Sequence, residues 1–273
     1  MALIDTHTHL ESFAKRGEFP ETLTRARAAG LEAMITIGTS PDDWTLYRGI
    51  AQENPGFVYY TVGLHPCSVK ADWKNAVEQI ESFWARKEAG ATNAQPVALG
   101  ECGLDRFHLP KDDPAQAAAI FGWQRAAFVA QLEIARRLQT PVVVHSRGAF
   151  QECVEMIDAS GVEWSRVVFH CFTEGPAEMA ELTRRGGFGS FTGILTYKSA
   201  DNVRDAARAQ GLARCLLETD APYLTPLPHR GKPNEPAFLK HTAEFAARTV
   251  FGVSEEILAA TTTDHARRFF GLK

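Results

Sequence analysis

The residues most suited to chemistry stand near the start of the chain, where Asp5, His7 and His9 follow a short apolar run. Successive side chains of a strand point to opposite faces, so these alternate residues share one face if the segment is extended. Imidazole nitrogens at the end of a strand are suited to binding a divalent metal ion. An isolated pair of histidines is equally well explained as the polar end of a strand, so the interpretation depends on the rest of the sequence.

Other potential ligands also come at the end of short apolar segments. These residues are His65, Glu101, His145, His170, Glu218 and Asp220. Together with the two histidines near the start of the chain, these residues include six side chains with the nitrogen and oxygen donors expected of metal ligands: His7, His9, Glu101, His145, His170 and Asp220. Six donors are too many for one tetrahedral ion, so we expect two divalent ions, Mg²⁺, Mn²⁺ or Zn²⁺, with Glu101 as the bridge.

Short β-branched segments alternate with longer segments of helical periodicity, which predicts repeated β and α elements. The expected strands are residues 2–6, 33–37, 58–62, 97–100, 141–144, 167–169, 187–191 and 215–217. The expected helices are residues 21–29, 42–53, 73–87, 115–138, 150–159, 176–185, 202–210, 236–250 and 254–270. This pattern is typical of an α/β fold of the TIM type, a (β/α)8 barrel, whose catalytic face lies at the carboxyl ends of the strands. An open doubly wound sheet is the alternative, but no GxGxxG motif follows the first strand.

The composition is that of a globular protein. With 273 residues and 45% hydrophobic content, we expect residues 1–273 to form a single domain. The net charge of -4 excludes a broad basic surface for non-specific duplex binding, so any contact with nucleic acid should be local. Five cysteines without a CxxC pair, and the lack of a signal or membrane segment, favour a cytoplasmic protein. No feature indicates an obligate protein partner.

Seven motifs, in order along nearly the whole chain, resemble the TatD family of metal-dependent deoxyribonucleases. They are residues 5–9, 62–66, 100–105, 144–147, 169–172, 217–224 and 229–236. The resemblance implies a divalent-metal hydrolase that cleaves phosphodiesters of DNA, including 3′-to-5′ exonuclease action on single strands. It also implies ligand roles for the same six residues. The chain departs from the family pattern at Cys102 and Arg106, which leaves the ligands intact but bears on substrate preference.

Further roles follow from residue type and position. Asp220 is expected to bind a metal ion and also to act as the general base. Glu101 is expected to be the second catalytic residue, as the carboxylate that bridges the two ions. Asp5 and Glu218 are expected to orient the metal ligands without binding the metal themselves, because ligating histidines usually donate their second N–H to a carboxylate. We expect His65, Arg147 and Arg230 to bind the substrate, with Arg147 pointing to the same side as His145.

Other residues lie outside this set. The aromatic residues Phe107, Phe172, Tyr223 and Trp73 could stack on bases, although core packing is the better explanation for most of them, and His241 and His265 are expected on solvated helix faces.

Two other functions remain open at this point. The same type of barrel could hydrolyse a small ester, lactone or amide, although such sites often use a modified lysine on the fourth strand, where this chain has none. A binding or scaffolding protein without turnover is the third hypothesis, and it does not explain why the full ligand set is present.

Overall fold

The computed structural model describes residues 2–85 and 94–273. Within these residues, eight strands belong to one sheet whose strand order follows the chain from β1 to β8. The strand pairs with a defined register are parallel. A parallel bridge between Thr8 and Ala221 joins the segment after β8 to β1. The (β/α)8 barrel predicted from the sequence is confirmed.

Contacts along the chain define two compact units. Unit 1 comprises Met1–Thr36, Asn54–Tyr59 and His170–Lys273. Unit 2 comprises Ile37–Glu53 and Tyr60–Phe169.

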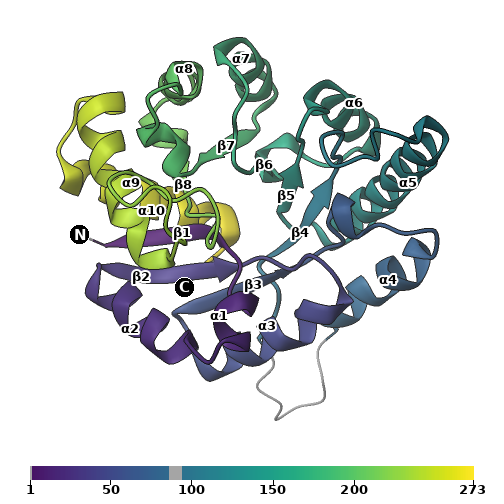
Figure 1. Cartoon of the computed structure of the whole chain (residues 1–273), viewed down its shortest axis with the longest axis horizontal. Coiled ribbons are helices and arrows are strands. Elements are labelled where there is room, and N and C mark those ends of the chain that lie inside the picture. The colour runs from purple at the N-terminus through teal and green to yellow at the C-terminus, as the bar shows by residue number, and fades with distance from the viewer. Residues whose placement is uncertain (1, 86–93) are drawn as a thin grey trace. The chain divides into compact units, whose positions relative to one another are not determined.

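Unit 1 contains the first two strands and the last two strands of the sheet. Its strands are β1 (Leu3–Thr8), β2 (Leu31–Thr36), β7 (Phe188–Phe191) and β8 (Leu216–Leu217). Its helices are α1 (Glu11–Lys15), α2 (Phe19–Ala28), α7 (Pro176–Arg185), α8 (Asp201–Gln210), α9 (Leu239–Phe245) and α10 (Glu255–Phe270). Strand β1 lies beside β2, and α7 packs beside α8 (Figure 1).

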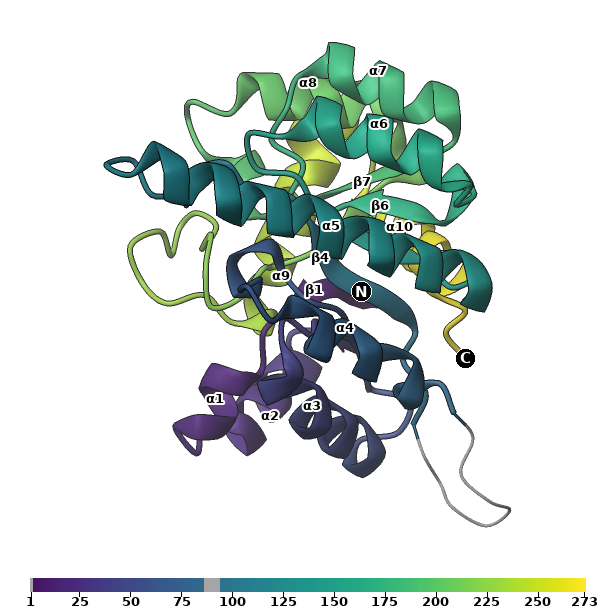
Figure 2. The ribbon, with the colours of Figure 1, turned by 90° about the vertical axis from the view of Figure 1, so that its right-hand side faces the viewer.

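Unit 2 contains the middle of the barrel. Its strands are β4 (Ala98–Gly103), β5 (Val142–His145) and β6 (Val167–Phe169), together with the last three residues of β3 (Val58–Val62). Its helices are α3 (Pro41–Glu53), α4 (Trp73–Ile80), α5 (Pro114–Leu138) and α6 (Phe150–Ser160). Helix α5 packs between α4 and α6 (Figure 2). Strands β5 and β6 read as nearly continuous apolar runs because both of their faces are buried.

Strand β1 is unusual because all six of its residues are buried although only Leu3 and Ile4 are apolar. Buried polar groups must find hydrogen-bond partners, and Thr6 meets this need by donating to the carbonyl of Leu217 at 3.0 Å. The polar residues of β1 are therefore buried on both faces of the strand, as expected of a strand that contributes to a site.

Local sequence signals explain where the long helices begin. The Asp113 side chain accepts a hydrogen bond from the Gln116 backbone N–H and Pro114 occupies the first turn, so α5 starts with both a cap and a favourable proline. Ser254 caps α10 in the same way through the N–H of Ile257.

Several predicted boundaries were wrong. Helix α1 was not predicted, and the helix expected at 236–250 is instead a 3₁₀ turn, α9 and a π-helical segment at Ala246–Phe251. The helix expected at 73–87 ends at Ile80 and is followed by a 3₁₀ turn, while residues 86 and 87 lie outside the described residues. Strand β4 continues to Gly103, which places Glu101 inside the strand rather than after it.

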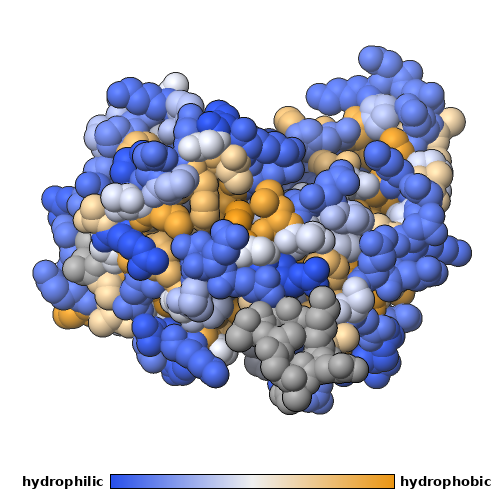
Figure 3. Space-filling model, turned by 90° about the horizontal axis from the view of Figure 1, so that it is seen from below, coloured by the Kyte–Doolittle hydropathy of each residue, from blue (hydrophilic) through white to orange (hydrophobic). Residues whose placement is uncertain are grey.

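The surface and the thiols agree with the composition. The face in Figure 3 is mostly hydrophilic, with hydrophobic side chains gathered in small patches. All five cysteines are free thiols, and Cys102, Cys153 and Cys215 are buried. Among the described residues, each helix is too short or too polar to cross a membrane.

Candidate metal centre

Three donor atoms in unit 1 form a triangle at the end of β1. The Nε2 atoms of His7 and His9 are 3.3 Å apart, and the Oδ1 atom of Asp220 lies 3.6 Å from the first and 3.3 Å from the second. Ligands bound at about 2.0–2.1 Å to one tetrahedral ion are separated by about 3.3 Å. The triangle therefore has the dimensions of one face of a divalent-metal site.

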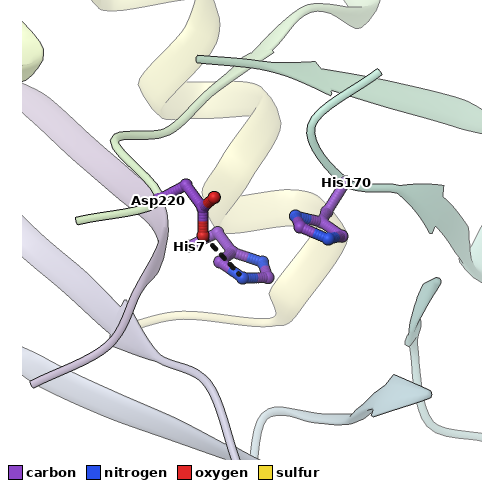
Figure 4. Close-up of side chains that lie close together, drawn as sticks. All are labelled: His7, His170 and Asp220. Atoms are coloured by element: carbon purple, nitrogen blue, oxygen red, sulfur yellow. Dashed lines mark ion pairs between the residues drawn. The ribbon is translucent and has the colours of Figure 1, made fainter. Parts of the chain in front are cut away.

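His170 completes this group from the loop that follows β6. Its ring stacks on that of His7, with centroids 4.0 Å apart and planes 11° apart. One donor atom each from His7, His170 and Asp220 lies within 4.8 Å of the others. Figure 4 shows the two imidazoles face to face, with the Asp220 carboxylate turned toward His7. We refer to His7, His9, His170 and Asp220 as the unit 1 cluster. Two or three imidazole nitrogens and a carboxylate oxygen form a donor set that suits zinc or a similar divalent ion.

Backbone contacts fix Asp220 against β1. Its N–H donates to the carbonyl of His7 at 2.9 Å, and the residue has a φ of 54°, a left-handed conformation that aspartate tolerates better than most residues. The preceding residue, Thr219, donates to Asp5 from its backbone N–H at 2.9 Å and from its hydroxyl at 2.6 Å. Asp5 therefore holds the segment that carries Asp220.

The two carboxyl groups of this region have opposite electrostatic character. Complete burial raises the pKa of Asp5 to about 7, and the hydrogen bonds from Thr219 offset the burial only in part. Burial also acts to raise the pKa of Asp220, but the hydrogen bond with His9 and the charges of the neighbouring histidines outweigh it and hold the pKa below its ordinary value. Asp220 is therefore ionised at neutral pH, as a metal ligand or proton acceptor must be.

Glu218 lies behind His170 rather than among the donors. Its Oε1 atom accepts the N–H of Cys171 at 2.6 Å and is 3.6 Å from Nδ1 of His170. Its Oε2 atom accepts a hydrogen bond from Ser190. This buried carboxylate can orient the imidazole of His170, which is the arrangement typical of metal-binding histidines.

Unit 2 carries a second group of donors on β4 and β5. Nδ1 of His145 is 2.9 Å from Oε1 of Glu101, and Glu101 is almost fully buried. On the other side of the ring, Nε2 of His145 is 2.9 Å from Oδ2 of Asp105. A proton held on Nε2 by Asp105 leaves the lone pair of Nδ1 directed to Glu101, so this pair can bind an ion through nitrogen and oxygen. We refer to Glu101 and His145 as the unit 2 pair.

His65 lies beside this pair but is poorly suited to be a ligand. Its Nε2 atom is 3.2 Å from Oε1 of Glu101. Its Nδ1 atom accepts the backbone N–H of Cys67 at 3.0 Å, so the proton of the neutral ring must be on Nε2. His65 therefore presents an N–H donor rather than a lone pair, which suits contact with an anionic oxygen.

Comparisons with known proteins identify the family of the chain. The family model described as TatD related DNase matches residues 4–271 of the chain. The chain belongs to the TatD family. It is 34% identical over 273 residues to the uncharacterized metal-dependent hydrolase YcfH of Escherichia coli K12, with coverage of 99% of this chain and 96% of that protein.

Two further comparisons extend this result. The protein named 3'-5' ssDNA/RNA exonuclease TatD of Rahnella is 34% identical over 263 residues, with 92% of each chain covered. The crystal structure of YJJV, a TatD homolog from Escherichia coli K12, superposes with a TM-score of 0.87 at 25% identity and covers 99% of this chain and 98% of that one. This TatD chain is therefore a metal-dependent hydrolase with the barrel fold of its family.

The arginines predicted to bind the substrate of this TatD chain are exposed and stacked on aromatic rings. The guanidinium of Arg147 lies 3.9 Å from the centroid of Phe107, and that of Arg230 lies 4.1 Å from the centroid of Tyr197. The argument that Arg147 shares the face of His145 was wrong, because β5 ends at His145 and Arg147 lies in the turn beyond it. Their roles in substrate binding stay predictions, as does the bridging role of Glu101.

Other expectations are resolved by burial. His265 was expected on a solvated face, but it is buried, and its Nδ1 atom is 3.2 Å from the carbonyl oxygen of Cys215. Phe172 is buried in the core, whereas Phe107 and Tyr223 are 53% and 62% exposed. Arg106, at a position where the chain departs from the family pattern, forms an ion pair with Glu152 and lies over the ring of Phe121.

Sequence reasoning missed Asp105. The residue is fully buried, accepts hydrogen bonds from His145 and His108, and lies two residues beyond the end of β4, the strand that carries Glu101. Burial acts to raise the pKa of Asp105, but these hydrogen bonds outweigh it and place the pKa well below its ordinary value. Its position in the Gly-Leu-Asp stretch after Glu101 was the available signal, because a buried carboxylate next to a ligand strand usually supports a ligand.

Proposed function

We propose that this TatD-family hydrolase cleaves phosphodiester bonds of DNA, as an exonuclease on single strands. The observation that carries the proposal is the triangle of His7, His9 and Asp220, whose edges of 3.3, 3.3 and 3.6 Å match one face of a divalent-metal site. The relatives named as exonucleases support the substrate class. The absence of lysine from β4, whose sequence is ALGECG, argues against the lactone or amide alternative.

The ligand roles expected from the sequence are part of this proposal. The unit 1 cluster would hold one ion and the unit 2 pair would hold a second, and Glu101 is the carboxylate that we expect the two ions to share. Two divalent ions held in this way would lower the pKa of the attacking water and stabilise the charge on the phosphate oxygens.

The side chains of the protein then have separate tasks. Ionised Asp220 accepts the proton of the attacking water, because its low pKa keeps the carboxylate available at neutral pH. His65 donates its Nε2–H to an oxygen of the phosphate or of the leaving group. Asp5 and Glu218 keep Asp220 and His170 in place.

Exposed side chains of the protein would hold the single-stranded DNA substrate. Arg147 and Arg230 can pair with phosphates, since guanidinium groups bind phosphate through two parallel hydrogen bonds. Tyr223, whose ring lies 6.3 Å from that of His9, can stack on a base close to the unit 1 cluster. Reduced thiols, as all five cysteines are, are in keeping with a cytoplasmic setting.

A side-by-side substrate panel tests this proposal. The metal-loaded protein should release nucleotides from single-stranded oligonucleotides, lose that activity with chelator and regain it with Mg²⁺ or Mn²⁺. Phosphomonoesters, lactones and amides should be turned over far more slowly. Faster turnover of a lactone or amide, or a nuclease activity that chelator does not stop, would contradict the proposal.

A further inference from the structure

We propose that Cys67, Asp105 and His108 form a binding site for a thiophilic divalent ion such as Zn²⁺, in addition to the donors described above. All three residues belong to unit 2. Cys67 lies in the 3₁₀ turn Pro66–Ser68 after β3, and the other two lie in the loop after β4.

The three donor atoms already have nearly the spacing that one ion requires. The Sγ atom of Cys67 is 3.6 Å from Oδ2 of Asp105 and 3.6 Å from Nδ1 of His108. A tetrahedral zinc ion with a Zn–S bond of about 2.3 Å and Zn–N or Zn–O bonds of about 2.0–2.1 Å separates sulfur from nitrogen or oxygen by about 3.5 Å. Both sulfur distances therefore fit without movement of the backbone.

The third distance is shorter because a proton occupies the place of the ion. Nδ1 of His108 is 2.8 Å from Oδ2 of Asp105, which is a hydrogen bond. In a tetrahedral zinc site the same two atoms are about 3.3 Å apart, so the imidazole must retreat by about 0.5 Å. The ring of His108 is half exposed and can make this small adjustment.

Charge and access also favour a divalent ion. A thiolate and a carboxylate together compensate two positive charges, so the occupied site is neutral. On binding, the thiol of Cys67 releases its proton to solvent and the proton of His108 moves from Nδ1 to Nε2, so one proton leaves per ion. Cys67 is exposed and lines a surface pocket of about 480 Å³, and the ring of His108 is half exposed, so an ion can reach two of the three donors from solvent.

The donor set also defines which ions compete. A thiolate selects soft or borderline ions such as Zn²⁺, Co²⁺ and Cd²⁺ over Mg²⁺, Mn²⁺ and Ca²⁺, which prefer oxygen. The unit 1 cluster and the unit 2 pair contain only nitrogen and oxygen donors, so sulfur coordination distinguishes the proposed site from them.

The site is linked to the unit 2 pair through one carboxylate oxygen. Oδ2 of Asp105 faces both Nδ1 of His108 and Nε2 of His145, at 2.8 and 2.9 Å. A carboxylate oxygen has two lone pairs, so Asp105 can bind the ion with one and keep the hydrogen bond from His145 with the other. Occupation of the site leaves the orientation of His145 intact.

Cobalt absorption tests the proposal directly. The Mn²⁺-loaded full chain is titrated with Co²⁺, and we expect a thiolate-to-cobalt charge-transfer band that saturates at about one equivalent per chain. Cys67→Ser should abolish the band, and His108→Ala should raise the midpoint at least about tenfold, as the loss of a ligand requires. Cys215→Ala, which removes a buried thiol of unit 1, should leave the band unchanged.

Thiol reactivity provides a second measurement. Cys67 is an exposed thiol, and Zn²⁺ should slow its alkylation in the wild-type chain but much less in His108→Ala. No band and no protection in the wild type would overturn the proposal, as would a band that persists in Cys67→Ser or a midpoint unaffected by His108→Ala. These readouts require no nuclease activity, so they separate this proposal from the proposed function.

Discussion

Replacing Asp5 with asparagine should change how the stability of the metal-free protein depends on pH. Asp5 is fully buried, and burial raises the pKa of its carboxyl from 3.8 to about 7. The folded protein therefore retains this proton at pH values where the unfolded chain has already lost it. Asparagine has nearly the same shape, cannot ionise and keeps a carbonyl oxygen that can accept the hydrogen bond from the Thr219 hydroxyl.

The size of the effect follows from the two pKa values. Because the folded-state value is raised, the stabilisation from Asp5 is complete below the unfolded-state pKa and is lost as the pH rises through about 7. The difference between 3.8 and about 7 corresponds to about 4 kcal/mol in total. Roughly 3 kcal/mol of this falls between about pH 5 and about pH 8.5. The stability of Asp5→Asn relative to wild type should therefore rise by roughly 3 kcal/mol over that interval.

Urea denaturation in the presence of a chelator, at both pH values, measures this difference. Asp264→Asn is a matched control, because Asp264 is exposed on α10 and forms an ion pair with the exposed Arg268. The control should follow wild type at both pH values. If the gap between Asp5→Asn and wild type stays constant within about 0.5 kcal/mol, Asp5 ionises near its ordinary pKa and the reasoning fails.

Four other predictions follow from the site and its surroundings. Glu101→Ala should lower the bound metal, measured by elemental analysis, from about two ions per chain toward one or none, whereas an unchanged count would remove Glu101 from the site. Asp220→Asn should reduce kcat on an oligonucleotide by about 10²-fold or more, while circular dichroism shows an intact fold. The control Asp264→Asn should retain full activity. Equal losses in the two variants would contradict a specific role for Asp220. Burial lowers the pKa of His265, so wild type should lose stability as the pH falls below about 6.5, and thermal melts of His265→Gln should show a smaller loss. Tyr223→Ala should weaken oligonucleotide binding by about 1–3 kcal/mol in anisotropy titrations if the ring stacks on a base.

The sequence was sufficient to predict the fold and the candidate donors because both depend on strand position. Alternating residues of a strand share a face, and the carboxyl ends of barrel strands carry the polar residues, so His7 and Asp220 could be assigned without knowledge of contacts. The structure places these two residues in one cluster although they are far apart in the chain. Their shared position at the ends of predicted strands is a signal that the sequence alone provides.

The features that the sequence could not predict lie in loops or depend on burial by residues far away in the chain. The contact between Cys67 and His108 joins the turns after two different strands, and no periodicity relates them. Arg147 stacks on Phe107 because a turn carries it past the end of β5, where strand parity no longer applies. His265 follows a helical pattern that does not reveal its burial against Cys215 and Phe188.

The hydrogen bonds between Asp5 and Thr219 span 214 positions of the chain. During synthesis, His7 leaves the ribosome long before its partner Asp220, which lies far along the chain. A nascent or prematurely terminated polypeptide that stops before Thr219 can fold local segments but lacks the carboxylate that closes the triangle. Assembly of the unit 1 cluster therefore waits until Asp220 has been synthesised, and products that end before it lack one donor of the triangle.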